Sequence, residues 1–158
     1  MTTIRAAVIG DEELLAKLNS LVQDLHLQRR PDHFRHTELS ERAGWYKSLL
    51  EEPTARMWIA EEQGTPVGYV LAVFHRLPEN PFTQARAWCE IDQIAVDSNH
   101  RRRGIGRALV LKAIAEVRAE GIQRVEATSW AFNEETQEVF RRLGFTPKTV
   151  RFELELPA

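Results

Sequence analysis

Cysteine is almost absent from this 158-residue sequence, which contains only Cys89. A single cysteine excludes an intramolecular disulfide and any zinc site built from several thiolates. Long apolar runs are also missing, since no stretch approaches the roughly 20 residues that a membrane-spanning helix needs. The first residues lack a charged leader followed by an apolar stretch, so we expect no secretory signal, no membrane partner and a cytoplasmic location.

An excess of positive charge is missing as well. The sequence has 21 Lys and Arg residues against 23 Asp and Glu residues, a net charge of −2. Proteins that coat nucleic acid or anionic membranes need a surplus of cations, so a nucleic-acid partner is not expected. The five histidines show no spacing typical of metal ligands, so no metal is expected. The length and the 43% apolar content predict one globular domain over residues 1–158.

Hydrophobic periodicity predicts an α/β fold. Helical spacing follows an N-cap at Asp11 and recurs in three later segments, 40–51, 104–120 and 133–143. Strand patterns cover 4–9, 57–61, 67–77, 87–96, 122–128 and 150–156. The segments between 87 and 128 form a βαβ unit, for which a right-handed crossover is expected. A meander joined to this unit predicts a mixed central sheet of six to seven strands with about four helices.

The predicted strand 87–96 changes its phase. Cys89 and Ile91 alternate on one set of positions, whereas Ile94 and Val96 lie on the other set. A β-bulge would bring both sets onto one face. A strand covered on both faces would produce the same pattern without a bulge. The pattern alone does not decide between the two.

The segment 101–107, Arg-Arg-Arg-Gly-Ile-Gly-Arg, links this strand to the next helix. Glycines allow a close backbone approach, and the first N–H groups of a helix have no partner within it. The helix dipole and the arginines add positive charge, so the segment is a candidate site for a polyanion such as a pyrophosphate.

Three other interpretations of this segment differ in strength. A Rossmann fingerprint needs a third glycine where Leu109 stands, although Glu126 lies about twenty residues after Gly106, where a ribose-binding acid would lie. A P-loop is excluded, because no Gly-Lys-Ser/Thr follows. A solvated basic turn without a ligand remains open on this segment alone.

Three segments together resemble the GNAT superfamily of N-acetyltransferases. The segment 101–106 is similar to its Arg/Gln-x-x-Gly-x-Gly/Ala signature, and 90–96 is similar to its fourth strand. The segment 133–145 is similar to its Asn-led helix that ends in Gly-Phe. The order and spacing of the three match the family, and the predicted elements upstream extend the resemblance over the whole chain.

This resemblance implies a GNAT fold with a splayed strand pair and transfer of an acetyl group from acetyl-CoA to an amine acceptor, with acetyl-CoA as a co-substrate. In the family, the pyrophosphate rests on backbone N–H groups, here 102–107, and the pantetheine pairs with the fourth strand, here around Ile94. A splay of the fourth and fifth strands frees the backbone groups for this pairing. The cofactor-binding residues implied are Ile94, Ala95, Val96, Arg101, Arg102, Arg103, Gly104, Ile105, Gly106, Arg107, Asn133 and Phe140.

Glu90 matches the position where some GNAT members place a general base, and Asp92 is a second candidate for the catalytic residue. Either carboxylate would act directly or through water on the attacking amine. The alternative for Glu90 is an acid that pairs with an arginine at the rim of the sheet. A backbone N–H near Ile94 would polarise the thioester carbonyl.

Phe140 is a departure from the family, since many members carry at this position a tyrosine that protonates the CoA thiolate. A phenyl ring has no proton to give, but a thiol pKa near 8.5 allows a thiolate to leave unaided. We therefore interpret Phe140 as a wall of the pantetheine tunnel. Asn133 is both a helix cap and a candidate CoA contact.

Other polar residues give weaker signals. Cys89 is predicted to be a buried, small apolar residue. The segment 26–37, with His26, Arg29, Arg30 and His33, lies where the family binds its acceptor, so these residues are candidates for recognition of a carboxylate-bearing acceptor. A solvated loop is the alternative.

Two functional hypotheses follow. The first is an acetyl-CoA-dependent N-acetyltransferase, and the second is a catalytically silent GNAT-fold domain that binds CoA in a regulatory role. The sequence identifies neither the amine acceptor nor the oligomeric state. Dimers are common in the family, so a homodimer is compatible with the resemblance.

Overall fold

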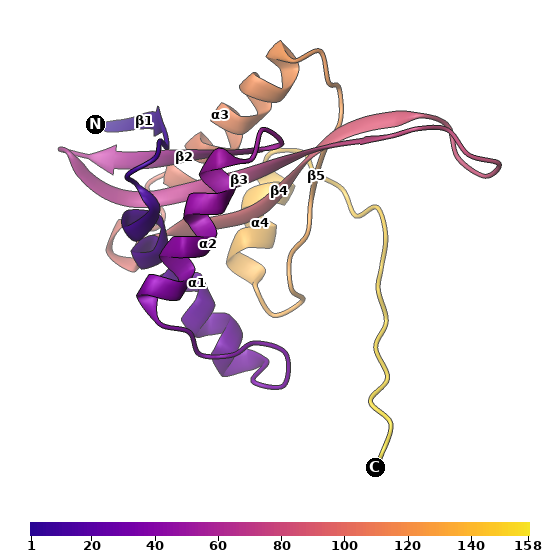
Figure 1. Cartoon of the computed structure of the whole chain (residues 1–158), viewed down its shortest axis with the longest axis horizontal. Coiled ribbons are helices and arrows are strands. Elements are labelled where there is room, and N and C mark those ends of the chain that lie inside the picture. The colour runs from indigo at the N-terminus through magenta and orange to yellow at the C-terminus, as the bar shows by residue number, and fades with distance from the viewer.

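The computed structural model describes residues 1–158 and has one five-stranded sheet with helices on both faces (Figure 1). The strands are β1 (Thr2–Ala6), β2 (Ala55–Glu62), β3 (Thr65–Leu77), β4 (Arg86–Val96) and β5 (Val125–Ala127). The helices are α1 (Glu12–Arg29), α2 (Leu39–Glu51), α3 (Ile105–Ala119) and α4 (Glu134–Arg142), with a short 3₁₀ helix at Ser98–His100. No helix combines the length and apolar character needed to cross a membrane.

The sheet is mixed, as predicted. Strands β1 to β4 form an antiparallel meander in chain order, and β5 pairs parallel to β4 after the α3 connection. Parallel pairing requires a crossover connection, which α3 supplies.

Two hydrophobic cores lie on opposite faces of the sheet. Helices α3 and α4 cover one face, where Leu109, Val110 and Phe140 pack with Cys89 and Ile91 of β4. Helices α1 and α2 cover the other face, and both lie in front of the sheet in Figure 1. Each face is sealed by its own pair of helices, so the edges of the sheet are where backbone groups stay accessible.

The phase change in β4 is a bulge. Ala72 of β3 pairs with Ile91 and Leu71 pairs with Gln93, so Asp92 has no partner on β3. Consequently Ile94 packs against the α3-side core together with Ile91. The bulge prediction is confirmed. Helices also cover both faces of this strand, since Ala95 packs in the core on the α1–α2 side.

The prediction of six to seven strands is wrong, because the structure has five. The predicted strand 150–156 alternates apolar and polar residues, but no backbone group of 146–158 hydrogen-bonds to another backbone group. Alternation shows that a segment can present one apolar face, whereas a strand also needs an edge to pair with. Figure 1 shows this C-terminal segment extended away from the body.

Two other predicted strands are shorter than their apolar patterns. Ile122 is buried beyond the end of α3, where its N–H bonds to the Val117 carbonyl, so β5 begins only at Val125. At the N-terminus the strand ends at Ala6, and the exposed Val8 and Ile9 belong to the turn before α1. In both places apolar residues lie at the turn that joins two elements.

The ends of β3 and β4 form a two-stranded arm, residues 75–88, that projects beyond the rest of the sheet (Figure 1). Strand β2 reaches only to Val73, and β5 begins its pairing at Cys89. Within the arm, His75 stacks on Trp88 with ring centroids 4.8 Å apart, and Arg86 lies 4.7 Å from the same ring. Phe82 at the tip is 95% exposed.

Candidate active site

The turn between β4 and α3 presents a row of unpaired amides. Arg102 and Gly104 adopt left-handed backbone conformations, with φ of 61° and 79°, and α3 begins at Ile105. No backbone N–H from 102 to 107 donates a hydrogen bond within the protein. Alternation of left- and right-handed residues turns successive amides towards one concavity, a geometry that binds anions. The helix N-terminus adds its partial positive charge.

The arginines around this turn divide into two pairs. Arg101 forms an ion pair with Glu135 at 3.1 Å, and Arg103 forms one with Glu62 at 3.3 Å. Arg102 and Arg107 are exposed and form no ion pair. Ion pairs of Arg101 and Arg103 therefore stabilise the turn, while Arg102 and Arg107 remain available to an anion.

Gly106 has a different role from Gly104. A Cβ at Gly106 would lie 3.7 Å from Val139 and 3.8 Å from both Ile94 and Val96, all ordinary contact distances. Its Cα–H therefore faces the core between β4 and α4. A residue larger than alanine would overfill this core, which explains the small residue here without any ligand contact.

Strands β4 and β5 diverge just before this turn. Their pairing covers only Cys89, Glu90 and Ile91, whereas β3 stays paired with β4 as far as Val96. From Asp92 onward β4 has a neighbour on one side only. This is the splay that the family resemblance implies, and it leaves the edge of β4 around Ile94, Ala95 and Val96 without a second strand.

Helix α4 lies beyond the splay. Asn133 caps it, since the side-chain oxygen accepts a hydrogen bond from the Thr136 N–H at 3.4 Å. Phe140 is 7% exposed and packs against Phe145, with ring centroids 5.1 Å apart. The cap prediction is confirmed, whereas the CoA contacts proposed for Asn133 and Phe140 stay predictions.

Glu90 is half-buried on β4, and its partners come from two other segments. Its Oε1 accepts a hydrogen bond from the Thr128 hydroxyl at 3.0 Å, and its Oε2 lies 3.5 Å from His75 Nε2. No arginine pairs with it, so the alternative of an arginine pair at the sheet rim is not formed. Glu90 is held between a strand of the arm and the residue that follows β5.

Asp92 is the extra residue of the bulge and is solvent-accessible. Partial desolvation by the surrounding protein raises its pKa above the ordinary value, and the nearby charge of Glu90 adds to this effect, while His75 opposes it. A carboxylate with a raised pKa is a better proton acceptor than an ordinary aspartate.

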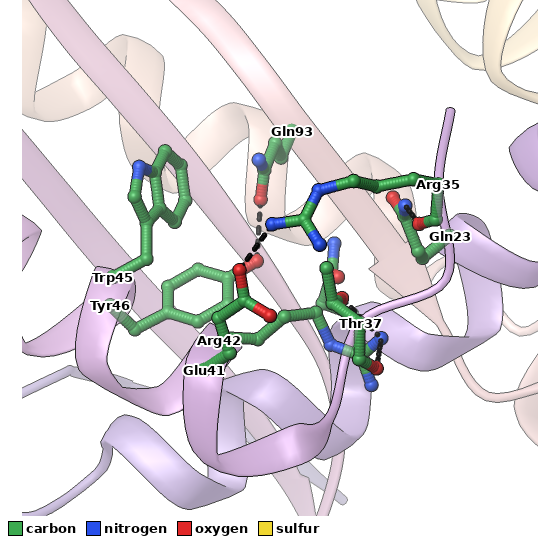
Figure 2. Close-up of a pocket in the computed structure, with 9 residues that line it drawn as sticks. Gln23, Arg35, Thr37, Glu41, Arg42, Trp45, Tyr46 and Gln93 are labelled. Carbon is green, nitrogen blue, oxygen red and sulfur yellow. Dashed lines mark hydrogen bonds and ion pairs between the residues drawn. The ribbon is translucent and has the colours of Figure 1, made fainter. Parts of the chain in front are cut away.

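A polar pocket of about 270 Å³ opens on the α1–α2 face beside β4 (Figure 2). At its base the hydroxyls of Tyr46 and Tyr69 lie 2.9 Å apart, and each is 2.7 Å from Gln93 Oε1. Burial raises the pKa of Tyr69 to about 12, so this hydroxyl keeps its proton at neutral pH. The lining residues are Asn19, Gln23, Arg35, Thr37, Glu41, Arg42, Trp45, Tyr46 and Gln93.

Sequence reasoning missed this pocket. Gln93 follows the bulge residue directly, so the base of the pocket lies next to Asp92 along β4. Arg35 pairs with Glu41 across the mouth, and Arg42 bonds only to neutral groups, including the Ser20 hydroxyl at 2.7 Å. The only signal in the sequence was Gln93, a polar residue between Asp92 and the apolar residues Ile94 to Val96 of β4. Its tyrosine partners lie far away in sequence.

The segment 26–37, predicted to recognise the acceptor, packs against aromatic residues of a second loop. His26 stacks on Phe34, with ring centroids 4.8 Å apart. His33 packs edge-on against Trp130, with ring centroids 5.0 Å apart. The Arg30 guanidinium carbon lies 5.0 Å from the centroid of the Trp130 ring. The loop after α1 is therefore joined to the loop between β5 and α4. Burial lowers the pKa of His26, so it is neutral at physiological pH. Arg29 is exposed.

Cys89 is fully buried, as predicted, and burial raises the pKa of its thiol to about 12. A thiol in this state does not serve as a nucleophile at neutral pH. No group of three or more His, Cys, Asp or Glu side chains is placed to hold a metal ion.

Comparison with known proteins shows the family to which this chain belongs. The model of the acetyltransferase (GNAT) family matches residues 18–145. The chain belongs to this family. An uncharacterized N-acetyltransferase of Methanocaldococcus jannaschii is 35% identical over 109 residues, covering 68% of this chain and 47% of that protein. The chain spans about half the length of the curated relatives it matches.

Solved structures share the GNAT fold. A mutant of the BH1408 protein of Bacillus halodurans has a TM-score of 0.92 at 24% identity and covers 98% of this chain and 99% of its own. A predicted acetyltransferase of Clostridium acetobutylicum, solved with acetyl-CoA, has a TM-score of 0.75 at 17% identity and covers 98% of this chain and 96% of its own. GNAT members use acetyl-CoA, and the five-stranded sheet and four helices of this chain are an instance of their α/β fold.

Proposed function

We propose that this protein is an N-acetyltransferase that moves the acetyl group of acetyl-CoA directly to an amine. The observation that carries the proposal is the row of unpaired amides at 102–107, placed at the end of the unpaired edge of β4. CoA offers two recognition elements, a pyrophosphate and an extended pantetheine chain that can hydrogen-bond to a strand. The turn amides would bind the first, and the adjoining edge of β4 would bind the second.

The pyrophosphate would occupy the turn. Amides directed at one point bind a diphosphate without a side-chain requirement. Arg102 and Arg107 would add screened charge contacts, since neither is engaged elsewhere. Arg101, Arg103 and Ile105 would contribute through the backbone and through the position of the turn.

The pantetheine arm would lie along β4 and replace the missing strand. Its amides would pair with backbone groups around Ile94, Ala95 and Val96, as an added strand does. This pairing would bring the thioester towards the bulge at Asp92. A backbone N–H near Ile94 would then stabilise the negative charge that develops on the carbonyl oxygen.

The amine would approach from the α1–α2 face. The polar pocket beside Gln93 is large enough for a small acceptor or the end of a chain, and its rim carries both charges, Arg35 and Glu41. Glu90 would accept the proton of the attacking amine, directly or through water, with His75 and Thr128 fixing its orientation. Asp92 is the second candidate for this role.

The reaction would balance as follows. The amine nitrogen forms a bond to the acetyl carbon and loses one proton to the base, the carbon–sulfur bond breaks, and CoA leaves as a thiolate. Phe140 cannot protonate that thiolate, so the proton would come from solvent. This gap is the one feature that favours the silent CoA-binding domain as the alternative function.

An acetylation screen separates the two functions. The full chain is incubated with acetyl-CoA and a panel of amines, comprising polyamines, amino acids, aminoglycosides and peptides with free N-termini, and products are detected by mass. If the protein is an acetyltransferase, one amine class should gain 42 mass units, the mass that one acetyl group adds, with matching release of free thiol. Binding of CoA with no product from any class supports the silent domain, and absence of CoA binding contradicts both.

A further inference from the structure

Arg42 of α2 is a half-buried arginine without an acidic partner. Four arginines are half-buried, and three of them pair with carboxylates, namely Arg5, Arg30 and Arg56. Arg42 bonds only to neutral oxygens, the Ser20 hydroxyl at 2.7 Å and the hydroxyl and carbonyl of Thr37 at 3.3 and 3.4 Å. Its Nε is buried and has no hydrogen-bond partner. A charge that is partly removed from water and lacks a counter-ion is unfavourable, and a bound anion would relieve it.

This guanidinium lines the polar pocket beside β4 (Figure 2). The other two charged lining residues, Arg35 and Glu41, form an ion pair with each other. All remaining lining residues are neutral, so Arg42 gives the pocket one unbalanced positive charge. A guanidinium presents its N–H groups in a planar fork that matches the two oxygens of a carboxylate.

An acidic group lies near the same pocket on the β4 side. Gln93, which accepts a hydrogen bond from the Tyr46 hydroxyl at the pocket base, directly follows Asp92 of the bulge. Burial raises the pKa of Tyr46, and two smaller effects come from charges, Arg42, which lowers it, and Asp92, which raises it. A positive and a negative group therefore lie within electrostatic range of one buried hydroxyl. This arrangement complements a ligand that carries both a carboxylate and an amine.

We infer, on the basis of the proposed acetyl transfer, that the amine acceptor is an amino acid whose carboxylate binds Arg42 in this pocket. The amine of such an acceptor extends towards Asp92 and Glu90, where the proposed base lies. Arg30, for which the sequence predicted a role in acid recognition, is already engaged by two carboxylates. An acceptor with amines and no acid group, such as a polyamine, meets an uncompensated positive charge instead.

Matched acceptors test this inference on the wild-type chain. Acetyl transfer from acetyl-CoA is measured for the protein amino acids and 4-aminobutyrate, each compared with the corresponding carboxamide, which lacks the acid charge. We expect kcat/KM to be roughly tenfold or more higher for the acid, because a charge-assisted, bidentate pair is stronger than a neutral contact. The amine of the carboxamide loses its proton more readily, so reactivity alone would favour the carboxamide.

Two variants of Arg42 assign the preference to its guanidinium. Arg42→Gln removes the charge and should raise the KM for the acid roughly 10- to 100-fold, with a much smaller change for the carboxamide. Arg42→Lys keeps the charge without the planar fork and should retain part of the preference. The control Arg118→Gln, on the exposed surface of α3, makes the same charge change away from the pocket and should keep the full preference.

Folding defects are separated from a loss of recognition by two further readouts. The ratio of acid to carboxamide turnover, measured on one preparation, does not depend on the fraction of folded protein. Titration with CoA should give the wild-type affinity in Arg42→Gln, since Arg42 lies on the α1–α2 face and outside the proposed CoA site.

Equal turnover of acids and carboxamides, or products only from amines without an acid group, would overturn the inference. So would an acid preference that survives in Arg42→Gln. If no amine is acetylated, the proposed function fails, and calorimetry on the CoA-loaded chain then decides the inference by itself. The amino acids should bind to the wild-type chain and not to Arg42→Gln, whereas no binding to the wild-type chain overturns the assignment.

Discussion

Asp92 shows how a single backbone irregularity decides the environment of one side chain. The bulge leaves it without a partner on β3, beside Glu90, and its pKa is raised by partial desolvation and by that neighbouring charge. A folded state that binds this proton more tightly than the unfolded chain loses stability as the pH rises from the ordinary aspartate value, about 3.9, through the raised one.

Replacing Asp92 by Asn should therefore stabilise the fold at neutral pH. We expect a gain of less than about 1 kcal/mol, because the exposed position screens the charge. The gain should vanish below the ordinary aspartate pKa, where both folded and unfolded chains are protonated. Urea unfolding at acidic and neutral pH measures it, with Asp24→Asn on the exposed side of α1 as the control. A variant less stable than the wild type at neutral pH would refute the stated environment.

The Glu90 carboxylate is the proposed general base. Glu90→Gln should lower kcat by roughly 10²-fold with little change in the KM for acetyl-CoA, because it removes a proton acceptor and no cofactor contact. The deficit should shrink at high pH, where the amine is already neutral. Glu13→Gln, on the exposed surface of α1, makes the same charge change away from the cleft. Full activity of Glu90→Gln at neutral pH would transfer the role to Asp92 or to water.

Phe140 can be tested by stability and turnover together. Phe140→Tyr should leave the fold as stable as before if the ring edge faces the pantetheine, and kcat should rise up to about tenfold if loss of the thiolate limits the rate. A hydroxyl forced into the core instead would cost about 1–3 kcal/mol of stability without any gain in rate. Phe140→Ala is a poor probe, since removing a core ring costs about 3–5 kcal/mol.

At the scale of elements, the two glycines of the β4–α3 turn have different roles. Gly104→Ala meets a left-handed φ of 79° and should weaken CoA binding, at a cost of about 1 kcal/mol in the turn itself. Gly106→Ala fits an ordinary contact and should bind CoA like the wild type, whereas Gly106→Val should lose affinity by displacing α4 from β4. Arg102→Ala should lose less affinity than Gly106→Val, on the order of 1 kcal/mol, because the contact is screened.

Titration calorimetry with CoA compares these four variants, with thermal unfolding to show that each is folded. Wild-type affinity in both Gly104→Ala and Gly106→Val would remove the pyrophosphate from this turn. Equal losses in Gly104→Ala and Gly106→Ala would mean that Gly106 faces the ligand and not the core.

The elements also show what a sequence can and cannot predict. The bulge was predictable only as one of two alternatives, because the change of phase between Ile91 and Ile94 fits either a bulge or a strand covered on both faces. The α3 turn was predictable because glycine and a helix start are local signals. The partners of Glu90, and the tyrosines below Gln93, were not predictable, because each contact joins segments that only the tertiary fold brings together.

At the scale of the whole molecule, the C-terminal segment marks the limit of local pattern. Its alternation gives the segment one apolar face, yet the pattern contains no information about whether any sheet has an edge that pairs with it. The predicted strand count was wrong for this reason, because Val150 to Leu156 fulfils the pattern of a strand without a partner in its own sheet.

The central claim is that CoA lies along the open edge of β4 with its pyrophosphate on the amides of the following turn. Two-dimensional amide NMR of the full chain, titrated with CoA, tests this directly. The largest shifts should fall on 102–107 and on Ile94, Ala95 and Val96, while the amides of β1 and β2 stay unchanged. Saturable shifts that spare both the turn and β4, or no shifts at all, would contradict it.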